Sequence, residues 1–145
     1  MCKICCFCGH RSIITENLEN ILEYTLTDLI ENQGYDTFYS GGMGEFDKLC
    51  ERVIRKLKRK FPYIHLCLII YKYKNNFDKD YYDECILPDL EGVHYKRAIT
   101  ERNKWMIKKS DLILCYIYKD HSGAYDTMKY AEKNKKNIIN LYKHP

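Results

Sequence analysis

The stretch Phe38-Tyr39-Ser40-Gly41-Gly42-Met43-Gly44-Glu45-Phe46-Asp47 combines the end of a strand pattern, a glycine turn and the start of a helix pattern. A short apolar run breaks into three glycines within four positions, and glycine lets backbone approach a ligand closely or take a positive φ. Apolar residues then recur at three- and four-residue steps as far as Phe61, which predicts an amphipathic helix. Its opposite, polar face carries Lys48, Glu51, Arg52, Arg55, Lys56, Lys58 and Arg59.

A strand, a glycine turn and a helix N-terminus in this order favour an anion. The first N–H groups of a helix are unpaired, and the helix dipole adds partial positive charge, so phosphate is the usual ligand. The alternative is a tight turn that binds nothing, because the spacing matches neither GxGxxG nor the GxxxxGK[ST] of the P-loop. Both interpretations stay open at this point.

The segments around this stretch alternate between strand and helix patterns. Continuous apolar runs at 3–8, 37–39, 64–70, 111–118 and 137–141 predict buried parallel strands. Helical patterns lie between them at 15–34, 46–61, 95–109 and 124–133, with Thr15 as the first N-cap and Gly34 as the first stop. We predict a loop at 71–79 and a short helix at 81–87. The fold class is therefore α/β: a Rossmann-like three-layer sandwich, with a five-stranded, mainly parallel sheet and helices on both faces.

Length and composition narrow the class of protein. The 145 residues suit one domain, 1–145, with a single core. No stretch reaches the ~20 apolar residues of a membrane span, and no signal peptide pattern is visible, so we expect a soluble cytoplasmic protein without a membrane partner. The net charge of +4 is mild and gathers at 55–60, where a solvated helix face or, secondarily, a nucleic-acid patch is expected.

Eight cysteines raise the questions of disulfides and metal binding. They lie inside apolar runs, so we interpret them as reduced, small hydrophobic residues. Two overlapping CxxC pairs and His10 open the chain, but no second ligand pair follows, and Cys6 would face away from Cys5 in a strand. We expect no metal and no cofactor.

The helix predicted at 95–109 carries an arginine on its inner face. Ile99 and Met106 share that face, and Arg102 and Asn103 fall between them. An unpaired buried charge is expensive, so Arg102 needs either a ligand or an internal carboxylate such as Asp47 or Asp126.

Three segments together carry a resemblance to a known family. They are Cys5-Cys6-Phe7-Cys8-Gly9-His10-Arg11, the stretch 39–47, and Arg102-Asn103-Lys104-Trp105-Met106 with Ser110-Asp111-Leu112-Ile113. This combination resembles the YpsA-like family of the SLOG superfamily, which pairs CxFTGHR with GxxxGFD and RNxxMVDxSD. The superfamily also contains phosphoribohydrolases of the LOG type, the single-strand-DNA-binding protein DprA, and sensors of NAD-derived signals.

The resemblance implies a nucleotide site between the glycine turn and the loop 121–124, with homodimers expected. The ligand-binding residues it implies are Gly9, His10, Arg11, Ser40, Gly41, Gly42, Met43, Gly44, Arg102, Asn103, His121, Ser122, Gly123 and Ala124. Residues 121–128 depart from the hydrolase pattern PGGxGTxxE, since the second glycine and the glutamate are missing.

Because the hydrolase pattern is incomplete, we rank the possible functions as follows. The first is binding of a small nucleotide-derived ligand, a nucleoside phosphate or an ADP-ribose-like molecule, by a sensor or sequestering protein. The alternative is a phosphoribohydrolase that uses Arg102 with one of Glu45, Asp47 or Asp126. A weaker alternative is single-strand DNA binding on the basic helix face, with tyrosines as stacking platforms.

Overall fold

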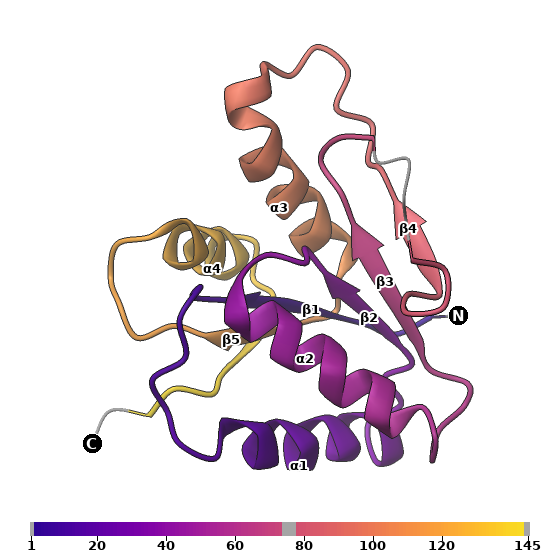
Figure 1. Ribbon diagram of the computed structural model, residues 1–145. Coiled ribbons are helices and arrows are strands. Elements are labelled where there is room, and N and C mark those ends of the chain that lie inside the picture. Colours follow the sequence, from indigo (N-terminus) through magenta and orange to yellow (C-terminus); the bar gives the residue numbers. More distant parts are fainter. Residues whose placement is uncertain (1, 74–77, 144–145) are drawn as a thin grey trace.

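The computed structural model describes residues 2–73 and 78–143, and Figure 1 shows their arrangement. The elements in chain order are β1 (Ile4–Gly9), α1 (Leu18–Glu31), β2 (Thr37–Ser40), α2 (Gly44–Leu57), β3 (His65–Ile69), β4 (Glu84–Ile86), the 3-10 turn η1 (Tyr95–Arg97), α3 (Ala98–Lys109), β5 (Leu112–Tyr116), α4 (Gly123–Lys133) and β6 (Asn137–Asn140). The predicted α/β sandwich is confirmed.

The sheet has the strand order β4-β3-β2-β1-β5-β6, and each neighbouring pair is parallel. The chain adds β2, β3 and β4 outward on one side of β1 and then crosses back to place β5 and β6 on the other side. Such a reversal opens a crevice at the carboxyl ends of the two central strands, where α/β sheets bind ligands. Here the crevice falls between β1 and β5.

The sheet has six strands instead of the predicted five, because β4 replaces the short helix predicted at 81–87. Tertiary contacts decide this segment. The Asp83 carboxylate accepts hydrogen bonds from Leu66 N at 2.7 Å and from Lys58 Nζ at 2.8 Å, which pins it beside β3. Residues 74–77 of the predicted loop lie outside the described residues.

Two helices cover each face of the sheet (Figure 1). Helices α1 and α2 pack on Phe7, Phe38, Leu66 and Tyr116, while α3 and α4 pack on the opposite strand positions such as Ile69 and Ile113. Six of the eight cysteines belong to these cores, as expected of small hydrophobic residues, whereas Cys2 is exposed and Cys85 is half-buried. Those that are buried are Cys5, Cys6, Cys8, Cys50, Cys67 and Cys115.

The structure also bears on metal binding and on membrane insertion. Within the described parts of the chain, no three His, Cys, Asp or Glu side chains gather as metal ligands would. Among residues 2–73 and 78–143, no helix combines the length and the apolar character that crossing a bilayer requires.

Three side chains differ from the sequence-based expectation. The N-cap of α1 is Asn17, with a φ of 61°, and not Thr15, whose Oγ1 lies 2.7 Å from Tyr116 Oη. Ile21, whose helical spacing from Leu18 predicts the buried face of α1, is 40% exposed. Glu51, predicted on the solvent face of α2, is fully buried because Ser40 Oγ and Tyr82 Oη donate to its carboxylate at 2.6 and 2.9 Å.

Candidate functional site

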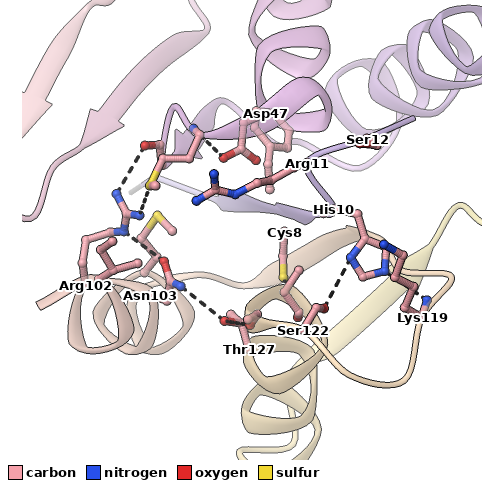
Figure 2. A pocket seen from close by; sticks show the side chains of 18 of the residues that line it. Cys8, His10, Arg11, Ser12, Asp47, Arg102, Asn103, Lys119, Ser122 and Thr127 are labelled. Carbon is pink, nitrogen blue, oxygen red and sulfur yellow. Dashed lines mark hydrogen bonds between the residues drawn. The ribbon is translucent and has the colours of Figure 1, made fainter. Parts of the chain in front are cut away.

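A cavity of about 450 Å³ opens at the carboxyl ends of β1, β2 and β5, between α2, α3 and α4 (Figure 2). This is the edge where the sequence placed the site. The residues expected there that line the cavity are Gly9, His10, Arg11, Gly41, Met43, Asp47, Arg102, Asn103, His121, Ser122, Gly123 and Ala124. Segments more than a hundred residues apart in the chain therefore meet at one place.

Five predicted residues do not line this cavity: Ser40, Gly42, Gly44, Glu45 and Asp126. Others line it without having been predicted, namely Phe7, Cys8, Ser12, Ile99, Met106, Tyr118, Lys119 and Thr127. Ser12 and Lys119 could have been predicted, because each lies shortly after the carboxyl end of a strand that was already assigned to this edge. Thr127 lies one helical turn beyond Gly123, a spacing that puts both on the same face of α4.

Three N–H groups in and directly after the glycine turn, those of Gly42, Met43 and Glu45, are engaged inside the protein. Gly42 N donates to Ser40 Oγ at 3.0 Å, and Met43 N donates to Asp47 Oδ2 at 3.1 Å. Glu45 N donates to the carbonyl oxygen of Arg11 at 2.9 Å. The turn is therefore less free to hold phosphate than its sequence indicated, because two nearby side chains and one carbonyl already accept from it.

The glycines of this turn are required by close packing. Gly42 has a φ of 68°, and a Cβ there would lie 2.8 Å from Leu68 Cδ1. Gly44 has a φ of 87°, and its Cβ would lie 2.8 Å from the Cα of Arg11. L-residues rarely adopt such φ values. Gly44 thus lets the segment after β1 lie against the start of α2, which places Arg11 at the cavity.

The second helix N-terminus at the cavity, that of α4, keeps free donors. Ser122 is its N-cap: its Oγ accepts from Tyr125 N at 3.0 Å, and its carbonyl oxygen accepts from Asp126 N at 3.0 Å. Gly123 N and Ala124 N have no hydrogen-bond partner in the part of the chain that the structure describes, and both residues line the cavity. The start of α4 therefore has the unpaired N–H groups that the sequence predicted for the glycine turn.

His10 holds this N-terminus in place. Its Nε2 accepts from Lys119 N at 3.0 Å, so in the neutral ring Nδ1 carries the proton and faces Ser122 Oγ at 3.4 Å. Burial and the nearby charges of Lys119 and His121 lower the pKa of His10, which keeps the ring neutral at pH 7. His10 thus connects the end of β1 to the cap of α4.

Arg102 points inward, as predicted, but it hydrogen-bonds neither Asp47 nor Asp126. Nη1 donates to the carbonyl oxygens of Ile69 at 2.7 Å and Gly41 at 3.3 Å, and Nε donates to Asn103 Oδ1 at 2.9 Å. Its Nη2 donates to Met43 Sδ at 3.3 Å. Across residues 2–73 and 78–143, no carboxylate forms an ion pair with it.

Arg102 is consequently a buried brace between β3, the glycine turn and α3. Burial lowers the pKa of its guanidinium, which nevertheless remains a cation, as arginine does in proteins. Gly41 must be small beside it, since a Cβ would lie 3.1 Å from Arg102 Cζ. Asn103 Nδ2 donates in turn to Thr127 Oγ1 of α4 at 3.4 Å, which links α3 to α4.

Of the three candidate carboxylates, one is at the cavity. Asp47 lines it and is buried, and burial raises the pKa of its carboxyl to about 7 against the lowering effect of the Met43 N–H. Glu45 is exposed and accepts from Ile13 N at 2.7 Å, and Asp126 is exposed on α4.

The rim of the cavity is cationic. Figure 2 shows the Arg11 side chain reaching into the space between α2 and α3, and Lys119 lies beside His10 on the opposite side. Both residues are exposed, and neither has an ion-pair partner among the described residues. His121 is paired with Asp120 at 3.0 Å. The cavity lined by Gly123 and Ala124 therefore carries two cations that have no ion-pair partner in the described parts of the chain.

The strand order, the two helices on each face and the cavity at the switch point define a Rossmann-like α/β fold. DNA processing protein A from Streptococcus pneumoniae is similar in structure, with a TM-score of 0.73 and 12% identity over 99% of this chain and 51% of that chain. The DNA processing protein A of Helicobacter pylori has a TM-score of 0.67 and 15% identity over 98% of this chain and 66% of that chain.

The molybdenum cofactor binding protein of Rippkaea orientalis is also similar, with a TM-score of 0.66 and 21% identity over 99% of this chain and 78% of that chain. At these identities the likeness shows a shared fold. No protein-family model matches the sequence, and no curated protein matches it either. The YpsA-like assignment within this fold therefore stays a prediction.

Proposed function

We propose that this protein binds a small nucleotide-derived ligand, a nucleoside phosphate or an ADP-ribose-like molecule, as a sensor or sequestering protein. One observation carries the proposal. Two unbonded N–H groups at the start of α4, from Gly123 and Ala124, lie on the same cavity as the unpaired cations Arg11 and Lys119. Backbone donors at a helix N-terminus with flanking cations suit a phosphate group.

The remainder of the cavity suits the organic part of such a ligand. Ile99, Met106 and Met43 provide apolar surface, and Asn103 provides an amide next to it. The volume of about 450 Å³ falls in the range of roughly 300–1,000 Å³ typical of small-molecule sites. The solved neighbours support ligand binding in general terms, since one is named for binding the molybdenum cofactor and another for binding single-stranded DNA.

Replacing Arg11 with methionine tests the anion site. We expect the affinity for adenosine 5′-monophosphate or ADP-ribose, measured by calorimetry, to fall by about 1.5–3 kcal/mol, the scale of a charged hydrogen bond. The melting temperature should stay unchanged, because the exposed side chain forms no ion pair in the described structure.

Arg59→Met is the matched control, since it removes the same charge from an exposed position after the C-terminal end of α2 that does not line the cavity. Equal losses of affinity in the two variants would indicate a general charge effect and would contradict the proposed site.

The basic face of α2 supports single-strand DNA binding poorly. Much of its charge is neutralised by carboxylates, mostly from α1. The pairs are Arg52 with Glu19 at 3.2 Å, Lys56 with Glu23 at 2.9 Å, Lys60 with Glu31 at 3.7 Å, and Lys58 with Asp83 at 2.8 Å. DNA would have to displace these pairs, and we therefore favour the small ligand.

A specific observation keeps the hydrolase as a second candidate. Asp47 lies on the cavity wall with a pKa of about 7, a value that suits a general acid or base near neutral pH. The proposed mechanism would use this carboxyl to assist departure of the base from a nucleoside monophosphate. Against it stand the missing glutamate in 121–128 and the engagement of Arg102 by backbone carbonyls.

Incubation with a panel of nucleoside monophosphates separates the two candidates. We expect the protein to bind these nucleotides without releasing free base. Chromatography of the mixture over several hours would detect any free base. If the wild-type protein releases base and the Asp47→Asn variant does not, the binding hypothesis is wrong and the hydrolase hypothesis is supported.

A further inference from the structure

Asp47 stands apart from the other acidic side chains because it is buried in the cavity wall. It is 7% exposed, and its Oδ2 accepts the Met43 N–H at 3.1 Å, which fixes the carboxyl group at the start of α2 (Figure 2). Among the described residues, no hydrogen bond to Oδ1 is found. Every fully buried polar side-chain atom there has a hydrogen-bond partner, so Oδ1 is not fully buried. Because Asp47 lines the cavity, we take Oδ1 to be exposed to it.

Among residues 2–73 and 78–143, no cation forms an ion pair with this carboxyl. Arg102 of α3 lowers the pKa of Asp47 by its charge, but its donors go to two backbone carbonyl oxygens, to Asn103 Oδ1 and to Met43 Sδ. Lys48 is directed to Glu51, 3.9 Å away, and Glu51 adds a like charge one turn along α2. The titratable and charged groups that face Asp47 are Lys48, Cys50 and Glu51 from α2, Cys6 and Cys8 from β1, Arg102 from α3, Tyr82 before β4, and Arg11 from the segment that packs against the start of α2.

These surroundings favour the protonated acid. Burial is the largest cause, Glu51 adds to it, and the Met43 N–H, Arg102 and Lys48 oppose it, with the result that the pKa of Asp47 is raised to about 7. At neutral pH the free protein therefore holds a mixture of the acid and the carboxylate. The acid has an O–H to donate, whereas the carboxylate can only accept.

We propose that Asp47 is a ligand-binding residue of this cavity, and that it hydrogen-bonds the anionic group of the ligand as the neutral acid, so that binding of the anion takes up a proton. The proposal rests on the proposed function and adds a chemical preference to it. The preferred ligand group is an oxyanion that accepts a hydrogen bond, and the ionised carboxylate would repel that group.

The direction of the pH dependence follows from linkage. A bound anion raises the pKa of Asp47 above its value in the free protein, and Asp47 in its acid form in turn raises the affinity for the anion. Below about pH 7 the acid form already dominates and the affinity changes little. Above about pH 7 each bound anion must also bring a proton, and affinity should fall by up to about tenfold per pH unit.

Asp47→Asn provides the test with adenosine 5′-monophosphate as the probe. The asparagine oxygen still accepts from Met43 N, and its amide donates to the ligand at every pH. Calorimetry at about pH 6 and pH 8, in pairs of buffers with different ionisation enthalpies, measures affinity and proton uptake together. Both proteins see the same ionisation of the probe, so the difference between them isolates Asp47.

We expect similar affinities at pH 6, and at pH 8 a roughly tenfold tighter complex for Asp47→Asn than for the wild type. The wild type should take up close to one proton more than the variant at pH 8. As a readout that needs no variant, the ¹³C signal of the Asp47 carboxyl should titrate near pH 7 and move to higher pH when the probe is added.

Two other outcomes would overturn the proposal, and they are distinguishable. If wild type and Asp47→Asn bind the probe with the same pH dependence, the proton-linked role of Asp47 is wrong while the proposed function stands. If neither protein binds the probe at pH 6 and the ¹³C titration is unmoved by it, the proposed function fails and the role of Asp47 fails with it.

Discussion

Replacing Gly9 with alanine is expected to destabilise the protein by about 1–3 kcal/mol, the usual cost of overpacking a core. A Cβ at Gly9 would lie 2.5 Å from Phe46 Cγ and closer still to Cδ2. Phe46 cannot give way easily, because it is fully buried and its ring stacks on that of Tyr116 with centroids 5.6 Å apart. Gly9 was predicted from resemblance as a ligand residue, and the structure adds this packing requirement.

Thermal and chemical denaturation of the ligand-free protein measure the effect. Gly123→Ala is the control, since a Cβ there has no protein atom within 4 Å. We expect its melting temperature to stay close to that of the wild type. A Gly9→Ala protein as stable as Gly123→Ala would mean that Phe46 does not pack against the end of β1 as described.

Arg102→Met is expected to reduce stability in the absence of any ligand. The change removes the donors from the carbonyl oxygens of Ile69 and Gly41, and each buried acceptor left without a partner costs about 1–3 kcal/mol. Arg102 also holds the glycine turn that carries Met43, so we expect ligand affinity to fall as well. A direct ligand contact alone would have weakened binding with little loss of stability.

Two further variants sharpen this experiment. Arg102→Lys keeps the charge but lacks the planar set of donors, and we expect it to recover less than half of the lost stability. Lys108→Met removes a cation from an exposed position of the same helix and should be nearly neutral. Urea unfolding that finds Arg102→Met as stable as Lys108→Met would refute the bracing role.

Much of the architecture was predictable from local pattern. Continuous apolar runs marked five of the six strands, because a strand covered on both faces must be apolar throughout. The four long helices followed from apolar residues at three- and four-residue spacing. The inward direction of Arg102 was also predictable, since it lies on the helix face of Met106, which is buried.

Strand β4 and the burial of Glu51 were not predictable in the same way. Residues 84–86 are too few to show a period, and their pairing depends on Asp83, which is held by Lys58 and Leu66. Glu51 falls on the polar side of its helix by spacing, yet Ser40 and Tyr82 reach it from other segments. Both outcomes depend on contacts between residues that are distant in the chain.

The sheet edge that carries the cavity, and most of the residues that line it, could be predicted from the sequence, because strand ends and their glycine turns are local features. Which N–H groups at this edge lack a partner among the described residues depends instead on how distant segments pack together. Ser40 and Asp47 accept from the glycine turn, whereas Gly123 and Ala124 keep open donors at the start of α4. That difference depends on the positions of side chains in space, which hydrophobic periodicity does not encode.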